Sequence, residues 1–241
     1  MPELSTQLRD LGLRAGATVM VHASMRAVGG RAEALLDALE DVVTADGRIL
    51  MLLCGPEDEP LDPATSPAWD ELGVLPEVFR RRATAVNDHP VARFGAWGRD
   101  AESLVIDPPL HDYYGPGSPL ERLVEADGHV LRLGADEDTV TLFHHAEYVA
   151  DVPDKRIAVG TWERLGPDGV EAITVRRLDD DDGIRPFDGE DYFKLILREL
   201  LAAGLASVGP VGGARAELLP ARESVDFAVR WLERTFGASG A

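Results

Sequence analysis

The sequence predicts an α/β protein: a single domain, residues 1–241, with a mixed central β-sheet flanked by helices and a β-hairpin insertion. Two observations carry this prediction. Short apolar and β-branched runs alternate along the chain with segments whose apolar residues recur at helical spacing. Near residue 166, a turn of glycine, proline and aspartate separates two further strand-like runs, which is the pattern of a hairpin. The chain shows no repeat, linker or low-complexity tail that would divide it.

The first half of the chain reads as a strand–loop–helix–strand unit followed by a long acidic, proline-rich loop over Gly55–Gly73. A loop of this length within a compact domain is usually functional or disordered. The expected elements are a helix over 5–13 capped by Ser5, a strand over Thr18–His22, a loop over Met25–Gly30, a helix over Arg31–Val43, a strand over 47–54, a helix over Leu75–Arg82 and a strand over 91–98.

The second half adds the hairpin and the remaining helices. Ser118, Pro119 and Glu121 occupy the cap, first and capping-box positions of a helix start. The other expected elements are a strand over 129–135, a helix over Thr141–Ala150, strands over Arg156–Glu163 and Val170–Leu178 around the turn Gly166–Gly169, and helices over Asp191–Ala203 and Glu223–Phe236.

Composition limits the cellular setting. The chain has no apolar run of about 18 residues and no secretion signal at its start, so we expect neither a membrane span nor export. Its single cysteine, Cys54, excludes an internal disulfide and a cysteine-built zinc site. The sequence therefore predicts a cytoplasmic protein.

The net charge is −19, from 43 acidic and 24 basic residues. Binding to nucleic acid requires a basic surface, so nucleic acid is not an expected partner. An acidic field would attract a polycationic small molecule, but it would equally serve only to keep the protein in solution.

Of the six histidines, only His144 has a setting typical of catalysis. It lies near the start of a predicted helix, and Thr141 and Glu147, three residues away on either side, share its face. A histidine titrates near neutral pH, so it can take a proton from an attacking nucleophile. The alternative is a histidine that only makes hydrogen bonds, which is the reading we adopt for His145.

Other motifs are less informative. The acidic run Asp179–Asp182 fits either a solvated turn or a cation site, and it lacks the closing glutamate of a calcium loop. Ser24 is not in a G-x-S-x-G elbow, and no phosphate-binding P-loop or G-x-G-x-x-G motif occurs.

Several segments, in order from about residue 10 to residue 237, resemble the aminoglycoside 3-N-acetyltransferases. They include VMVHASMRAVGG, HPVARFGAWG, GPGSPLERLVEADGHVLRLGA and EDYFKLILRELLAAG. The most specific is DTVTLFHHAEYVADVPDKR together with the upstream LGA. The resemblance implies acetyl transfer from acetyl-CoA to an amine, without a metal, and leaves a homodimer open as the assembly.

The resemblance also assigns roles to residues. It implies coenzyme contacts along the first glycine-ended loop and at two helix starts, namely Ser24, Met25, Arg26, Ala27, Val28, Ser118 and Thr141. It places the general base at His144 and an orienting carboxylate at Glu190, with Asp179 as the other candidate. Arg176 and Arg177 stand where relatives often carry acids, which leaves the acceptor open.

For the acceptor we expect a polycationic amine held by two acidic segments, with Glu57, Asp58, Asp179 and Asp181 as the contact residues. The predicted reaction is acetylation of the 3-amino group of a 2-deoxystreptamine aminoglycoside, which confers antibiotic resistance. The alternatives are an acetyltransferase for another amine in biosynthesis and a non-catalytic antibiotic-binding protein on the same fold.

Overall fold

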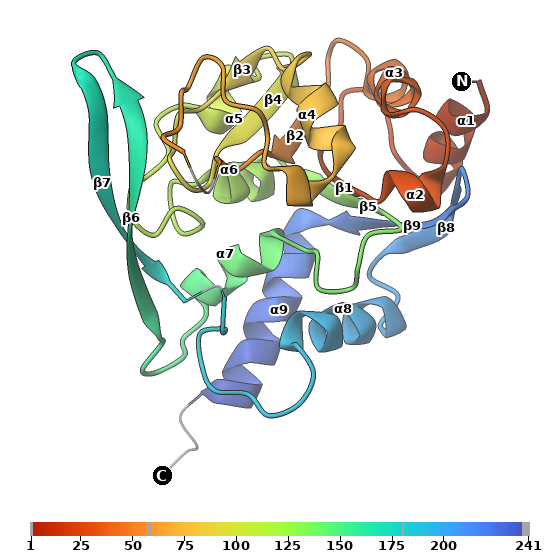
Figure 1. The fold of residues 1–241 in the computed structure, drawn as a ribbon. Coiled ribbons are helices and arrows are strands. Elements are labelled where there is room, and N and C mark those ends of the chain that lie inside the picture. The colour runs from red at the N-terminus through yellow and green to blue at the C-terminus, as the bar shows by residue number, and fades with distance from the viewer. Residues whose placement is uncertain (1, 57–58, 180, 238–241) are drawn as a thin grey trace.

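The computed structural model describes residues 2–56, 59–179 and 181–237 (Figure 1). The helices are α1 (Pro2–Leu11), α2 (Met25–Val28), α3 (Ala32–Val43), the 3-10 helix η1 (Asp70–Leu72), α4 (Val74–Arg80), α5 (Glu102–Val105), α6 (Pro119–Glu125), α7 (Leu142–Val149), α8 (Tyr192–Ala202) and α9 (Ala221–Phe236). The strands are β1 (Thr18–Ala23), β2 (Arg48–Leu52), β3 (Ala85–Val86), β4 (Phe94–Gly98), β5 (His129–Leu133), β6 (Ile157–Gly166), β7 (Gly169–Leu178), β8 (Ser207–Val211) and β9 (Ala214–Pro220).

Seven strands form one sheet, in the order β3-β4-β2-β1-β5-β9-β8. The central strand β1 runs parallel to both of its neighbours, β2 and β5. The remaining pairs in this sheet are antiparallel. The predicted mixed sheet is therefore confirmed, and strands from both ends of the chain share it.

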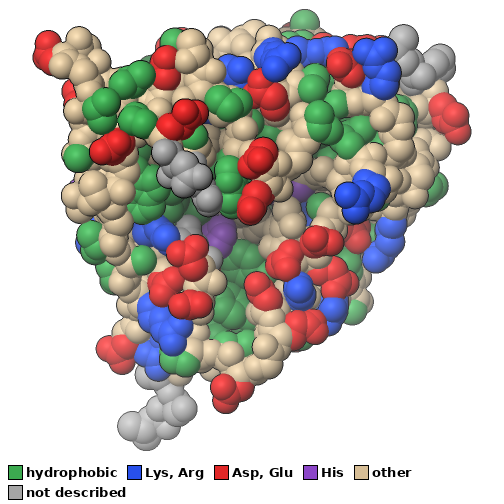
Figure 2. All heavy atoms as spheres, viewed as in Figure 1, with side chains coloured by type: hydrophobic (Ala, Val, Ile, Leu, Met, Phe, Trp, Pro, Cys, Tyr) green, Lys and Arg blue, Asp and Glu red, His purple; other side chains and the backbone are tan. Residues whose placement is uncertain are grey.

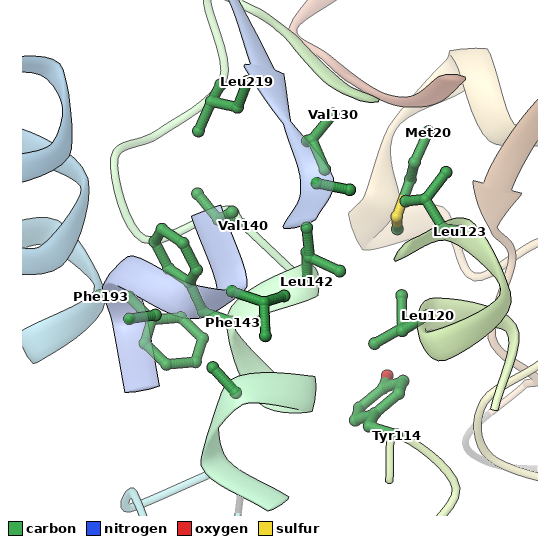
Figure 3. Close-up of a cluster of buried hydrophobic side chains, with 14 of the residues drawn as sticks. Met20, Tyr114, Leu120, Leu123, Val130, Val140, Leu142, Phe143, Phe193 and Leu219 are labelled. Atoms are coloured by element: carbon green, nitrogen blue, oxygen red, sulfur yellow. The ribbon is translucent and has the colours of Figure 1, made fainter. Parts of the chain in front are cut away.

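Helices cover both faces of the sheet. Alternate residues of each strand point to opposite sides, and the apolar side chains on each side are buried against helices. Val19 and Val21 of β1 belong to the core that α1, α3 and α4 build on one face. Met20, between them, belongs to the second core, which contains residues of α6, α7, α8 and α9. Figure 3 shows part of this second core, where the sheet residues Met20 and Val130 lie near side chains from helices α6 and α7. The side chains of Leu142 and Phe143, at the start of α7, thereby belong to the same core as these strand residues.

The predicted hairpin forms a separate two-stranded sheet of β6 and β7, paired from Ile157 with Leu178 to Gly166 with Gly169. It stands at one side of the molecule (Figure 1). The long loop after β2 reaches across to it, since the Leu61 amide donates to the carbonyl of Glu163 at 2.8 Å and the Leu165 amide to the carbonyl of Leu61 at 2.8 Å. The loop is thus joined to the hairpin at Leu61.

The structure departs from the sequence prediction in several places. The segment Met25–Gly30, expected to be a loop, contains the short helix α2, and η1, β3 and α5 were not predicted. The first helix spans Pro2–Leu11 rather than 5–13, so Ser5 lies within it and not at its start. Strands β8 and β9 were not predicted; β8 (SVGPV) lies at the edge of the sheet, where the missing amide of Pro210 is tolerated. Among the described residues, none of the helices has both the length and the apolar character that crossing a membrane requires.

Candidate active site

Helix α7 carries His144 and follows a loop, 134–141, that leaves the end of β5. A buried arginine at the end of that strand organises the loop: the Arg132 guanidinium donates to the carbonyls of Ala135 at 3.0 Å, Asp136 at 2.7 Å and Thr139 at 3.3 Å. Its charge is balanced by Glu217 of β9, which is also buried. The start of α7 therefore has a fixed position relative to the sheet.

The imidazole of His144 is held by a carboxylate on its own helix. Nδ1 of His144 lies 2.8 Å from Oε2 of Glu147, one helical turn later. The Glu147 side chain is 2% exposed and that of His144 is 20% exposed. Since an ionised carboxylate only accepts hydrogen bonds, Nδ1 carries the proton, and Nε2 is left as the basic nitrogen.

Aromatic rings fix the plane of the imidazole. Tyr114 stacks on it, with ring centroids 5.1 Å apart and planes 12° apart, and Phe193 of α8 contacts it edge-on at 4.8 Å. His145 points elsewhere, as predicted: it is buried, and its Nδ1 lies 2.9 Å from the Tyr114 carbonyl. His145 therefore supports the backbone of the ring that stacks on His144.

His144 and Glu147 line a cavity of about 310 Å³ between α7 and the segment that leads into α8. Figure 2 shows a hollow on this face with a histidine side chain at its bottom and acidic side chains along both sides. The other carboxylates that line the cavity are Asp138, Asp181, Asp182, Glu190 and Asp191.

Three of these carboxylates have a cationic partner: Asp138 pairs with Lys194 at 3.0 Å, Asp181 with Arg177 at 2.9 Å and Glu190 with Arg198 at 2.6 Å. Asp191 instead caps α8, accepting from the Phe193 amide at 2.7 Å. In the described part of the chain, the Asp182 carboxylate has no ion-pair partner. The cavity therefore keeps an excess of negative charge.

A second, larger cleft of about 660 Å³ lies on the other side of the 134–141 loop. It is lined by the end of β1, the start of α2, the segment 71–76 and the loop residues Ala135, Asp136, Thr139 and Thr141. Burial, together with the nearby Arg132 charge, lowers the pKa of His22 in this cleft to about 3, so this imidazole is neutral. Thr141 and His144, three residues apart, face the larger cleft and the acidic cavity respectively.

The predicted coenzyme residues divide into two groups. Ser24, Met25, Arg26 and Thr141 line the larger cleft. Ala27 and Val28 do not line it, since Val28 is buried and Ala27 packs closely against Gly134. The prediction for Ser118 is corrected: this residue is fully buried, and its hydroxyl accepts from the Glu121 amide at 3.3 Å as the cap of α6.

The predicted pairing of His144 with Glu190 is also wrong. Glu190 lines the same cavity, but its carboxylate accepts from Arg198 at 2.6 and 2.9 Å, and Glu147 occupies the position beside the imidazole. Asp179 does not take that place either. Its carboxylate accepts from the amides of Asp181 at 3.3 Å and Asp182 at 3.1 Å and so closes a turn.

Of the predicted acceptor residues, Asp181 lines the cavity, Asp179 holds the turn beside it, and Glu57 and Asp58 fall outside the described residues. Arg176 pairs with Asp112, away from the cavity lining, whereas Arg177 pairs with Asp181. As expected for neighbours on a strand, the two arginines separate, and only one reaches the cavity residues. No group of His, Cys, Asp and Glu side chains suited to a metal ion occurs among the residues the structure describes.

Sequence reasoning missed two residues that complete the site. Tyr114 had no signal of its own, because it lies in an irregular loop far from His144 in sequence. Tyr192 of α8 donates from its hydroxyl to Oε1 of Glu147, and that link depends on how α8 packs against α7. The role of Glu147 did have a signal, namely its spacing of three residues from His144 on one helix.

The chain is similar to known proteins over almost its whole length. Residues 20–233 match the family model described as aminoglycoside 3-N-acetyltransferase. The chain is 40% identical to aminoglycoside N(3)-acetyltransferase VII of Streptomyces paromomycinus, with 97% of this chain and 91% of that protein covered. It is 38% identical to aminoglycoside N(3)-acetyltransferase III of Pseudomonas aeruginosa, with 96% and 92% covered.

Solved structures show the same fold. The structure described as AAC-IIIb binary with CoASH has a TM-score of 0.92 at 37% identity and covers 99% of this chain and 97% of its own. AAC-VIa bound to sisomicin has a TM-score of 0.90 at 34% identity, with 98% of each chain covered. The chain therefore belongs to the aminoglycoside 3-N-acetyltransferase family, whose named members are acyltransferases.

Proposed function

We propose that this protein transfers an acetyl group from acetyl-CoA to the 3-amino group of a 2-deoxystreptamine aminoglycoside, directly and with His144 as the general base. One observation carries the proposal. The basic Nε2 of an imidazole already held in the correct tautomer by Glu147 lies in an acidic cavity, one helical turn from a second cleft. A cation would bind in the first space and the coenzyme in the second.

The acidic cavity suits the acceptor, because an aminoglycoside carries several ammonium groups. An ammonium group cannot attack, so the reacting amine must be neutral when it forms its bond to carbon. As the nitrogen bonds to the thioester carbon, Nε2 of His144 takes the proton that the nitrogen must lose. Glu147 stabilises the imidazolium that results, because it is a buried carboxylate in direct contact with Nδ1.

The larger cleft suits the coenzyme. A relative of the same fold has been solved with coenzyme A. The first amides of α2, those of Met25 and Arg26, have no acceptor within their own short helix, and both residues line this cleft. These amides would therefore serve the thioester oxygen as it becomes negative. Collapse of the tetrahedral intermediate then expels the coenzyme A thiolate, which leaves readily, and no covalent enzyme intermediate is needed.

The product carries one positive charge fewer than the antibiotic, since an amide nitrogen is not basic. Loss of that charge is the basis of the proposed resistance function. Because acetyl-CoA is available inside cells, the proposed reaction requires the protein to work in the cytoplasm. Relatives bear the aminoglycoside name, and one solved neighbour is bound to sisomicin.

The proposal is tested by following release of the coenzyme A thiol with a panel of 2-deoxystreptamine aminoglycosides and simple monoamines. We expect release with the aminoglycosides, a mass increase of one acetyl group, and an NMR shift confined to the carbon and protons at position 3. Release only with monoamines would favour an acetyltransferase for another amine. Tight aminoglycoside binding without any release would favour a non-catalytic binding protein.

A further inference from the structure

The hydroxyl of Tyr192 joins two parts of the site that are far apart in sequence. Tyr192 is the first residue of α8, and its ring is buried among Phe187, Phe193, Trp231 and Phe236. The phenol oxygen accepts a hydrogen bond from the Ile184 amide at 3.2 Å and donates its proton to Oε1 of Glu147.

The direction of these hydrogen bonds is settled by the groups involved. A backbone amide only donates and an ionised carboxylate only accepts, so the phenol proton points to Glu147. Burial and the Glu147 charge raise the pKa of Tyr192, so the phenol keeps this proton at neutral pH. Glu147 is therefore held on both oxygens, by His144 on one and by Tyr192 on the other.

The Ile184 amide, at one end of this series of hydrogen bonds, directly follows residues that line the acidic cavity. Asp181, Asp182 and Gly183 line that cavity, and Ile184, the next residue, is fully buried. Gly183 has a φ of 75°, and a Cβ there would lie 2.8 Å from a ring carbon of Tyr192, so the backbone is pressed onto the phenol ring. The acidic segment thus contacts Tyr192, the residue whose hydroxyl donates to Glu147.

We infer that Tyr192 is a positioning residue that couples the acceptor-binding segment 181–184 to the His144–Glu147 pair. When the segment binds a cation, any shift of its backbone at Gly183 and Ile184 changes the hydrogen bond from the Ile184 amide to the Tyr192 hydroxyl. The same hydroxyl donates to Glu147, so the change reaches the carboxylate that orients His144. This inference rests on the proposed function for its kinetic consequences. The coupling itself is a property of the free protein and can be measured without turnover.

The test is Tyr192→Phe, which keeps the buried ring and removes only the hydroxyl. Tyr148→Phe is the matched control, because the Tyr148 hydroxyl accepts from the Leu178 amide at 2.9 Å, a bond of the same kind just before the acidic segment, and the hydroxyl makes no bond to Glu147. Neither variant alters the other groups near the base pair. These are the Tyr114 ring, the cavity carboxylates Asp138, Asp181, Asp182, Glu190 and Asp191, and Lys155, whose charge interacts with Glu147.

We expect Tyr192→Phe to lower kcat about tenfold, as loss of a hydrogen bond to a charged group would, and to raise the acceptor KM. The low-pH limb of kcat/KM should move to higher pH by about one unit. Without the Tyr192 donor, Glu147 interacts more strongly with the protonated imidazole of His144 and stabilises that form. Coenzyme A affinity should stay within about twofold, because the hydroxyl does not reach the larger cleft. In the Glu147→Gln background the same substitution should not lower kcat further, because the carboxylate through which the hydroxyl acts is absent.

Two-dimensional NMR of the imidazole proton of His144 gives a second readout, one that needs no activity. Its titration midpoint should move upward in Tyr192→Phe and not in Tyr148→Phe. If both variants lose thermal stability alike while neither the pH limb nor the His144 titration moves, Tyr192 is only a packing residue and the inference is overturned. If no amine is acetylated by any form, the proposed function fails, and the titration still decides the coupling.

Discussion

Oε2 of Glu147 lies 2.8 Å from Nδ1 of His144, one turn away on the same helix, and this contact defines which nitrogen of the imidazole is the base. Both residues sit on α7, so their separation depends on the helix alone and not on the docking of a distant loop. The stacked Tyr114 ring and the edge of Phe193 then leave the imidazole little freedom to rotate. A base held in this way needs little reorganisation when it takes the proton.

Replacing His144 by Asn should lower kcat by about 10² to 10⁴, the usual contribution of a general base. Coenzyme A affinity should change little, because His144 lines the acidic cavity and not the larger cleft. Steady-state kinetics together with calorimetric titration of coenzyme A separates the two effects. His111→Asn, at an exposed histidine, is the control. A kcat within threefold of the unmodified protein would remove His144 from the mechanism.

Glu147→Gln tests the orienting carboxylate. The Tyr192 hydroxyl would still donate to the glutamine oxygen, which turns the amide nitrogen toward His144. Nδ1 of His144 must then accept a hydrogen bond from that amide, so the ring proton moves to Nε2. Protonated Nε2 cannot take a proton from the amine. We expect kcat to fall by about 10⁴, as when a comparable carboxylate is replaced by its amide behind other histidine bases.

Glu190→Gln is the matched comparison, since Glu190 lines the same cavity but pairs with Arg198. It should leave kcat within about threefold and the pH profile of kcat/KM in place, as expected for the loss of a solvent-exposed ion pair. The reverse result, a slow Glu190→Gln enzyme beside a normal Glu147→Gln enzyme, would show that the contact seen on α7 is not the functional one.

The acceptor site is tested at Asp182, a cavity carboxylate without an ion-pair partner among the described residues. Asp182→Asn should raise the aminoglycoside KM about three- to tenfold with kcat nearly unchanged, because the charge binds ground and transition states alike. Raising the salt concentration should increase the KM of the unmodified protein and shrink this difference, since exposed charges are screened.

Asp154→Asn is the control for Asp182→Asn, because Asp154 is 90% exposed and lies outside the cavity lining. Its KM should match that of the unmodified protein at every salt concentration. If neither substitution nor salt alters the aminoglycoside KM, the acidic cavity does not hold the acceptor ammonium groups.

Most of the central fold could be predicted from sequence because its strands are nearly continuous apolar runs and its helices have clear apolar faces. β1 and β2 are buried on both sides, and their composition shows it. β8 was not predicted because it is an edge strand that is mostly exposed and contains glycine and proline, so its sequence has no pattern of buried residues. Its partner β9 was missed with it, although β9 is largely buried.

The site could be predicted only where one element supplies it. Thr141 stands at the cap position of α7, three residues before His144, so their spacing is enough to bring them to neighbouring clefts. The choice between Glu147 and Glu190 depends on packing: α8 brings Tyr192 onto Glu147 and directs Glu190 to Arg198. Ser118 illustrates the same limit, because a helix start that resembles an anion site in sequence is fully buried in the fold.

A last prediction concerns stability toward acid. His89 is 3% exposed; its Nδ1 accepts from the amides of Val91 at 3.1 Å and Ala92 at 2.9 Å, and Nε2 donates to the carbonyl of Leu110 at 3.1 Å. Burial lowers the pKa of His89 to about 4 from its ordinary 6.5. Between these two values the unfolded chain binds the proton and the folded protein does not, so stability falls as the pH drops from 6.5 to about 4.

At pH 5 the loss from His89 should be about 2 kcal/mol relative to pH 8, from 1.36 kcal/mol per pKa unit. His89→Asn keeps an acceptor near the Nδ1 position but cannot titrate, so its free energy of unfolding should depend less on pH by about that amount. Urea unfolding at pH 8 and pH 5 measures both forms. His22, whose pKa is also lowered by burial, should leave a residual loss of the same sign in His89→Asn. An unchanged pH dependence in His89→Asn would mean that His89 accepts a proton in the folded protein as readily as in the unfolded chain.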